Sequence, residues 1–445
     1  MTAALLENLD FSFRSLAALT AVAVPLYAGW VRGRRYALFA GIVLWVSLPG
    51  AVISHIRLTA LFPEWTLPWL HAAFGYCMAA AALHLSHLVR ARLRSWPFRW
   101  LVSLPGQTFI AAGFMAGLWL LALLPLRAAL SVLGLDGVLQ ALRVLDLVPF
   151  AVAGGAIVTS LRLAAETVRL RLGDDGPDVV TRLPVERHRR RTPPPLAERP
   201  LRIVQIADPH LGPWKSVTAL RRSIEALLAR DPDLVLLTGD YLTMEGSGTP
   251  GALAEALTPL RSRAAQSYAI FGNHDHESVE EVRGALDQHG VRLLVDAEAV
   301  AETPVGPVQI IGSNWVQRDR RSHLVNLLRR YPRRKDHLRL LLLHDPSGFR
   351  HIPPGEVDLT LSGHTHGGQV GLVSLGLDWT VLSGSRWPDH GLFALGSNRL
   401  YVHRGTGFYG FPLRVGVPGE ASMLELTGLP AGRSSTASAA DAATR

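Results

Sequence analysis

The sequence has a single cysteine and almost no lysine. Cys77 lies within an apolar segment, so the chain has neither a disulfide framework nor a cysteine-based metal site. Lys215 and Lys335 are the only lysines, and arginine therefore carries nearly all of the positive charge. The second half also lacks a basic patch interleaved with aromatic side chains, so nucleic acid is not an expected partner.

Apolar residues and charges are separated along the 445 residues. The chain is 48% hydrophobic yet has a formal net charge of +9, a combination that is unusual for one soluble globular domain. The apolar excess lies before about residue 165. A positive balance suits either nucleic acid or an anionic membrane surface. Because many of the arginines flank apolar segments, the membrane is favoured.

Five long apolar segments occupy the first part of the chain. They are Leu16–Trp30, Tyr36–Ile53, Trp69–Val89, Gly106–Leu126 and Val144–Leu161. A spanning helix needs roughly 20 mostly apolar residues, so the middle three fit best; Asp146 weakens the fifth. His71 and His84 lie inside the third segment, where we expect them to face neighbouring helices rather than a ligand. Successive runs predict an α-helical membrane domain of about five spans over residues 1–165, rather than a cleaved signal peptide.

Arginines cluster after alternate segments. Arg32, Arg34 and Arg35 follow the first segment; Arg90, Arg92, Arg94 and Arg99 follow the third; Arg162, Arg169 and Arg171 follow the fifth. Positive residues mark the cytoplasmic side of a membrane protein. The alternation predicts an integral, multi-pass protein of the cell membrane with an outside N-terminus and a cytoplasmic second half.

Two stretches have compositions that do not suit a packed core. Residues 166–200 contain Arg187–Arg191 and Pro193–Pro195, and we expect an extended, basic, proline-rich linker. Its arginines suit either anionic lipid headgroups or a solvated spacer. Residues 429–445 are rich in Ala, Ser and Thr and predict a disordered tail.

From Leu201 onward, short apolar runs alternate with helical patterns. Predicted strands are Leu201–Ala207, Leu234–Thr238, Gln266–Phe271, Val308–Gly312, Leu338–Leu343 and Val357–Leu361. Predicted helices are Thr218–Arg230, Gly251–Arg261, Ser278–His289 and Arg321–Tyr331. This alternation indicates an α/β sheet with helix layers, in which ligands bind at the carboxyl ends of strands.

Metal-competent side chains follow five of these strands. They are Asp208 and His210, then Asp240, then Asn273, His274 and Asp275, then His344, then His364 and His366. Oxygen and imidazole ligands without thiolate suit Mn, Fe or Zn ions. There are too many candidates for one ion, so a carboxylate shared by two ions is the natural arrangement. Two such ions can clamp a phosphoryl oxygen and activate a water.

The order D-x-H, G-D, G-N-H-D, H and G-H-x-H resembles the calcineurin-like metallophosphoesterase superfamily over about Leu201–Leu426. Within it, the chain is similar to the membrane-anchored branch, the transmembrane proteins with a metallophosphoesterase domain. The preceding apolar segments point there, as do the late motifs Tyr401–Gly407 and Pro412–Arg414. The resemblance implies an α/β metallophosphoesterase domain at 201–428, built as a double β-sandwich flanked by helices.

The resemblance also implies a role for each strand-end residue. One metal would be held by Asp208, His210 and His366; the other by Asn273, His344 and His364; and Asp240 would bridge both. His274 would be the catalytic acid, oriented by Asp275. Pro209 departs from the ordinary residue expected within D-x-H and predicts slightly altered ligand geometry. His276 and Arg404 are further candidates for substrate contact.

The implied function is a membrane-anchored phosphoesterase with two divalent metal ions that uses metal-activated hydroxide. Its substrate would be a phosphodiester, pyrophosphate or phosphomonoester, either a small molecule or lipid-linked at the bilayer. The alternative is a membrane regulator or phosphate-binding protein with a non-catalytic metal site. An intact acid at His274 favours the enzyme.

Overall fold

The computed structural model describes residues 3–173, 176–189 and 193–428. The chain divides into two compact units. Residues up to Thr159, with Gly410–Leu413, form the first, and Ser160–Tyr409, with the chain from Arg414, forms the second. The tail predicted at 429–445 lies outside the described residues.

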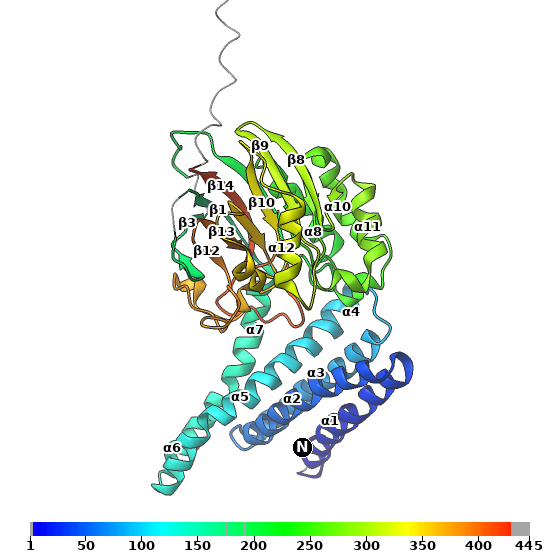
Figure 1. The fold of residues 1–445 in the computed structure, drawn as a ribbon. Helices are drawn as coiled ribbons and strands as arrows, with labels where there is room; N and C mark the ends of the chain where they lie inside the picture. Colours follow the sequence, from blue (N-terminus) through cyan, green and yellow to red (C-terminus); the bar gives the residue numbers. More distant parts are fainter. Residues whose placement is uncertain (1–2, 174–175, 190–192, 429–445) are drawn as a thin grey trace, which may run out of the picture. The chain divides into compact units, whose positions relative to one another are not determined.

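The first unit is helical (Figure 1). Its helices are α1 (Ala3–Arg32), α2 (Arg34–Thr59), α3 (Leu67–Leu88), α4 (Trp96–Phe98), α5 (Leu104–Val132), α6 (Asp136–Ala141) and α7 (Val148–Leu161). Among the described residues, four stretches are long and apolar enough to cross a membrane: Asp10–Arg32, Arg34–Thr59, Trp96–Val132 and Asp136–Leu161. The predicted helical membrane region is confirmed. The third predicted span, helix α3, is not among these four stretches, because its histidines lower its mean hydropathy.

Histidines of the first unit meet polar groups of neighbouring helices. The Nε2 atom of His55 lies 3.0 Å from Nδ1 of His71. The Nε2 atom of His84 lies 2.8 Å from the side-chain nitrogen of Gln107. Polar groups within an apolar bundle need such partners, and these contacts agree with the expectation that His71 and His84 face other helices.

Asp146 is buried and is paired with two arginines. Its carboxylate lies 2.6 Å from Nε of Arg57 and 2.5 Å from Nη2 of Arg127. A buried charge requires such compensation. These pairs explain how a carboxylate is tolerated at the start of the fifth apolar segment.

Within its described residues, the second unit contains two seven-stranded sheets. The first has the order β3 (Glu186–Arg189), β1 (Leu163–Arg171), β14 (Gly419–Thr427), β4 (Leu201–Ile206), β5 (Leu234–Leu237), β6 (Ser267–Ala269) and β7 (Arg292–Leu293). The second has the order β2 (Thr181–Leu183), β12 (Gly391–Leu395), β13 (Asn398–Val402), β11 (Leu359–Ser362), β10 (Leu338–Leu342), β9 (Gly306–Gly312) and β8 (Ala297–Thr303). Strands β4 to β7 are parallel to one another, as are β9, β10, β11 and β13.

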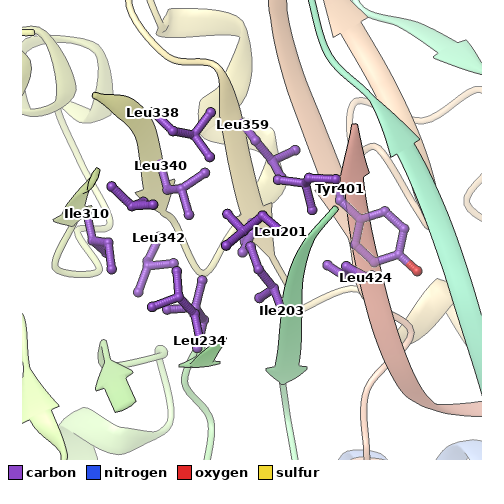
Figure 2. Packing of buried hydrophobic residues seen from close by; sticks show 14 of the residues in the cluster. Leu201, Ile203, Leu234, Ile310, Leu338, Leu340, Leu342, Leu359, Tyr401 and Leu424 are labelled. Atoms are coloured by element: carbon purple, nitrogen blue, oxygen red, sulfur yellow. The ribbon is translucent and has the colours of Figure 1, made fainter. Parts of the chain in front are cut away.

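The apolar core lies between the two sheets (Figure 2). Leu201 and Leu234 of the first sheet share one buried cluster with Leu340 and Leu359 of the second. The helices are α8 (Val217–Leu228), α9 (Met244–Ser247), α10 (Ala252–Leu257), α11 (Val279–Gln288) and α12 (Arg320–Arg330). Helix α12 buries leucines in a further cluster with the second sheet, and α8, α10 and α11 lie together in Figure 1. The predicted double β-sandwich flanked by helices is confirmed.

The structure differs from the prediction of a linker at 166–200. Strand β1 pairs in parallel with β14 from Leu163 to Arg171. Strand β3 pairs with β1 in the first sheet, and β2 pairs with β12 in the second. Several of the described arginines that suggested a solvated spacer are paired instead, as in the 3.1 Å contact of Arg169 with Glu425, whereas Arg190 and Arg191 lie outside the described residues. Arg187 and Arg189 both bind Glu166, at 2.7 and 3.1 Å, rather than being free for lipid headgroups.

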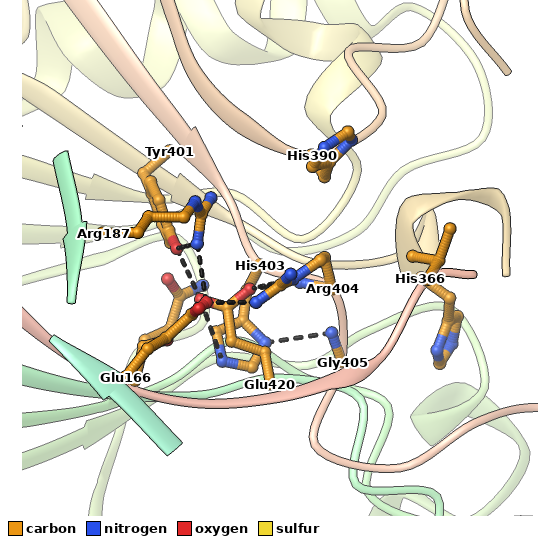
Figure 3. A network of polar contacts seen from close by, with 12 residues as sticks. Glu166, Arg187, His366, His390, Tyr401, His403, Arg404, Gly405 and Glu420 are labelled. Atoms are coloured by element: carbon orange, nitrogen blue, oxygen red, sulfur yellow. Dashed lines mark hydrogen bonds and ion pairs between the residues drawn. The ribbon is translucent and has the colours of Figure 1, made fainter. Parts of the chain in front are cut away.

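A buried ionic network joins β1 to the late motif (Figure 3). Glu166 and Glu420 both bind Arg404, whose Nε lies 2.9 Å from Glu420. The Tyr401 hydroxyl donates to Glu420. Because Arg404 has no exposed side-chain surface and both of its partners are carboxylates, the structure does not support its predicted contact with substrate phosphate.

We expect Glu166→Ala to destabilise the second unit strongly. The change leaves Arg187 and Arg404 with one buried carboxylate fewer, and breaking a buried ion pair costs about 3–5 kcal/mol. The thermal unfolding midpoint of the detergent-purified full chain measures the loss. Glu186→Ala removes an exposed carboxylate from the same sheet and should cost less than about 1 kcal/mol. Equal midpoints for the two variants would contradict the structural role of Glu166.

Candidate metal centre

The predicted ligands meet at the carboxyl ends of strands from both sheets. Strands β4, β5 and β6 lead to Asp208 and His210, to Asp240, and to Asn273. Strands β10 and β11 lead to His344, and to His364 and His366. Parallel strands bring these ends to one edge, where an α/β fold binds its ligands.

Three buried residues form the first cluster. Asp208, His210 and His366 each offer one ligand atom, and these atoms lie within 4.8 Å of one another. The two Nε2 atoms are 3.1 Å apart, and Nε2 of His366 is 3.7 Å from Oδ1 of Asp208. This spacing allows all three to bind one cation.

The second cluster contains Asp240, His344 and His364, again with ligand atoms within 4.8 Å of one another. The Nε2 atom of His344 lies 3.3 Å from Nδ1 of His364 and 3.1 Å from Oδ1 of Asn273. The Nδ1 atom of His344 is 2.7 Å from the carbonyl of Thr238, so it donates there and leaves Nε2 as a ligand atom.

Asp240 lies between the clusters. Its Oδ2 atom is 3.2 Å from Nε2 of His344 and 3.8 Å from Nε2 of His210. Its Oδ1 atom accepts a 2.9 Å hydrogen bond from the backbone N–H of His274. One carboxylate therefore faces ligands of both clusters.

The backbone of five predicted ligands adopts the left-handed region. The φ angles are 48° for Asp208, 44° for His210, 57° for Asp240, 70° for His364 and 52° for His366. This conformation is costly for residues other than glycine, and such strain concentrates at functional sites. The sharp turns aim each side chain back across the ends of the strands.

Pro209 and Gly363 each lie next to predicted ligands and are compatible with these turns. The backbone amides flanking Pro209 bind the carbonyls of Gly239 and Asp240 at 3.0 and 3.2 Å, so the missing proline N–H removes neither contact. A Cβ atom on Gly363 would lie 2.1 Å from Oδ2 of Asp208, and only glycine permits this approach. The slightly altered ligand geometry expected from Pro209 stays a prediction.

The electrostatics of the two clusters favour cations. Burial above all lowers the pKa of His210 to about 3 and that of His364 to about 4, so both are neutral imidazoles. Burial opposes a charge on His344, but Asp240 raises its pKa to about 10. A metal ion would displace the proton shared by His344 and Asp240, as ligand binding requires. The residues present therefore fit a pair of divalent ions.

The position of His274 suits an acid at the open side of the centre. Its ring is half-buried and stacks on Tyr409, with ring centroids 4.3 Å apart. Burial lowers its pKa, but the nearby carboxylates of Glu277 and Asp240 outweigh that effect, so the pKa of His274 is raised. The protonated form therefore persists to higher pH.

Asp275 has a different partner set from the one expected. Its carboxylate accepts hydrogen bonds of 2.7–2.8 Å from the backbone N–H groups of Asp240, Tyr241 and Gly272. The nearest acid to the His274 ring is instead Glu277, at 3.8 Å. Asp275 thus fixes the turn that carries Asp240, rather than orienting His274 by direct contact.

Tyr409 and Arg414 contact residues of the centre but had no predicted role, whereas His276 was a candidate for substrate contact. Tyr409 stacks on His274, and Arg414 donates to the His366 ring at 3.3 Å. Both belong to the late glycine-rich region, which was the available sequence signal. His276 is exposed beside Trp315, with ring centroids 5.9 Å apart.

A double β-sandwich that gathers carboxylate and imidazole ligands at its strand ends defines a metallophosphoesterase. Residues 201–368 match the family model of the calcineurin-like phosphoesterases. The chain belongs to this family and is a metal-dependent phosphoric ester hydrolase.

Relatives extend this similarity. Phosphodiesterase YaeI of Escherichia coli (strain K12) is 30% identical over 51% of this chain and 82% of its own length. A transmembrane protein with metallophosphoesterase domain from Danio rerio is 28% identical over 52% of each chain. Among solved structures, Haemophilus influenzae NAD nucleotidase (NadN) matches 47% of this chain and 45% of its own at 16% identity. Its TM-score of 0.30 is too low to inform the fold.

Proposed function

We propose that the chain is a membrane-anchored phosphoesterase with two divalent ions joined by Asp240. Asp208, His210 and His366 would hold one ion, and Asn273, His344 and His364 the other. The observation that carries this proposal is the position of the Asp240 carboxylate, which lies 3.2 and 3.8 Å from ligand atoms of the two clusters.

When bound, the ions would polarise the phosphoryl group and lower the pKa of an attacking water. His274 would give its proton to the ester oxygen that leaves. Tyr409 would hold the His274 ring by stacking, and Asp275 would keep the Asp240 turn in place through three backbone amides.

The proposed substrate is a phosphodiester, pyrophosphate or phosphomonoester. A lipid-linked phosphoester or pyrophosphate at the bilayer surface is placed first, and soluble phosphodiesters second. The candidate membrane spans support placing lipid-linked substrates first, and the name of the Escherichia coli relative supports phosphodiesters as a class. Hydrolysis assays with added Mn²⁺ across phospholipids, nucleotide-lipids and soluble nucleotides test it. No hydrolysis of any of these substrates by a metal-loaded chain would overturn the proposal.

We expect single histidine replacements to separate the two ions. His364→Ala should empty the ion position shared with Asn273 and His344, whereas His366→Ala should empty the one shared with Asp208 and His210. Metal content per chain should fall by about one ion in each case, because each ion loses one of its ligands. Loss of both ions in either variant, or of neither, contradicts the assignment.

The arginine distribution supports a multi-pass membrane protein whose catalytic unit is cytoplasmic. A reporter that fluoresces only in the cytoplasm should be fluorescent when it is fused after residue 428. A reporter that is active only on the outer side of the membrane should be inactive when it is fused at the same position. The reverse pattern would place the catalytic unit outside.

A further inference from the structure

Exposed apolar side chains of the second unit gather in one loop. Among its described residues, nine large apolar side chains are exposed, and five of these lie between 372 and 381. They are Leu372 (37% exposed), Leu375 (74%), Leu377 (54%), Trp379 (50%) and Val381 (54%). Exposed apolar groups are ordinary when scattered, but a contiguous set of this kind marks a contact surface.

The loop is fixed to the metal centre at its base. The amide of Leu372 binds the carbonyl of Trp379 at 2.9 Å, and the amide of Val381 binds that of Val370 at 3.0 Å. The hydroxyl of Thr365, between the two histidine ligands, donates to the carbonyl of Asp389 at 2.6 Å. The apolar tip therefore projects from a base held by the same turn that carries His364 and His366.

A cavity of about 680 Å³ adjoins this loop. Trp379, Leu382 and Trp387 line it, together with Arg350 and Arg386. The Arg386 guanidinium lies 4.3 Å from the centroid of the Trp387 ring. Tryptophan and arginine beside leucine form the combination that occupies a lipid–water interface, with apolar groups toward the acyl chains and cations near the headgroup phosphates.

We propose that residues 372–387 contact the lipid bilayer and guide a lipid phosphoester to the metal centre. This inference rests on the proposed phosphoesterase function and specifies its substrate class. The bilayer is the favoured occupant because the same chain carries four stretches able to cross it, which keep the catalytic unit near lipid.

Fluorescence quenching tests the contact with lipid. A Cys77→Ala background with Leu375→Cys allows one environment-sensitive label on the full chain in phosphatidylcholine–phosphatidylglycerol nanodiscs. Spin-labelled acyl chains should quench this label several-fold more than one at Val300→Cys, a 36% exposed position on β8. Equal quenching at both positions overturns the proposal. If the label at position 375 is quenched in nanodiscs that hold two copies but not in those that hold one, the surface contacts a second copy, and this result also overturns the proposal.

Two matched esters test the substrate class. The same nanodisc-embedded chain is given hexadecyl p-nitrophenyl phosphate and its soluble methyl counterpart. The double variant Leu375→Asp/Leu377→Asp should lower kcat/KM for the hexadecyl ester by about tenfold and leave kcat/KM for the methyl ester within about twofold. The control variant Val300→Asp should change neither value. Equal losses on both esters contradict the role of the loop. If the wild type hydrolyses neither ester, the proposed function fails, while the quenching result still decides the lipid contact.

Discussion

Asp240→Asn should abolish hydrolysis and loosen both metal ions. We expect kcat/KM to fall by about 10³-fold or more, equivalent to about 4 kcal/mol of transition-state stabilisation. The change keeps the side chain's shape and an acceptor for the His274 amide, yet it removes the negative charge between the two clusters. Phosphodiester hydrolysis and metal content, measured on the same preparation, check both parts.

A matched control separates this effect from backbone strain. Asp231 also adopts a left-handed backbone, with φ of 53°, but its side chain is 72% exposed and pairs with Arg263 rather than with a predicted ligand. Asp231→Asn should therefore keep its metals and nearly full activity. A fully active, metal-replete Asp240→Asn protein would exclude Asp240 as the bridging ligand.

His274→Ala should lower turnover while the metal content stays intact. Loss of a general acid typically costs about 10²–10⁴-fold in rate. The His274 side chain lies beside the clusters but belongs to neither of them, so both ions should remain bound. Turnover and metal content of the purified full chain measure the two effects.

The leaving group distinguishes an acid from a merely structural histidine. The loss should be larger for an alkyl ester, whose leaving oxygen needs a proton, than for a nitrophenyl ester, which leaves readily as an anion. His276→Ala, next but one along the chain and exposed, should stay within about twofold of the wild type. Unchanged turnover in His274→Ala would exclude His274 as the general acid, whereas no turnover in the metal-loaded wild type would favour a regulator whose metal site does not catalyse.

The alternation of strands and helices predicted where the candidate ligands gather. Apolar runs such as Leu201–Ala207 and Leu338–Leu343 match β4 and β10, because buried parallel strands are continuous apolar stretches. Polar residues directly after such runs must lie at one edge of a sheet. The structure brings Asp208 and His344 to that edge, although they are far apart along the chain.

Strand β1 was missed for an equally physical reason. Its arginines resemble a solvated connector until the carboxylates that pair with them are known, and Glu425 lies at the opposite end of the catalytic unit's sequence. Composition reports charge but not pairing. The same limit hid the burial of Arg404 between Glu166 and Glu420.

Local side-chain geometry around the centre was also beyond the sequence. A motif places Asp275 next to His274, but the left-handed turns decide which groups face each other. The carboxylate of Asp275 faces backbone amides, and the partner of the His274 ring is Tyr409, supplied by a loop more than a hundred residues later. Loop conformations of this kind depend on tertiary contacts rather than on spacing.

The most direct test of a two-ion centre is a titration of the metal-free full chain with Mn²⁺, followed by EPR and phosphodiester hydrolysis. We expect activity to require about two ions per chain and to appear with an exchange-coupled EPR signal, since a shared carboxylate holds two ions close together. Asp240→Asn should show only isolated ions. Full activity at one ion per chain, with an isolated-ion signal in the wild type, would contradict the account.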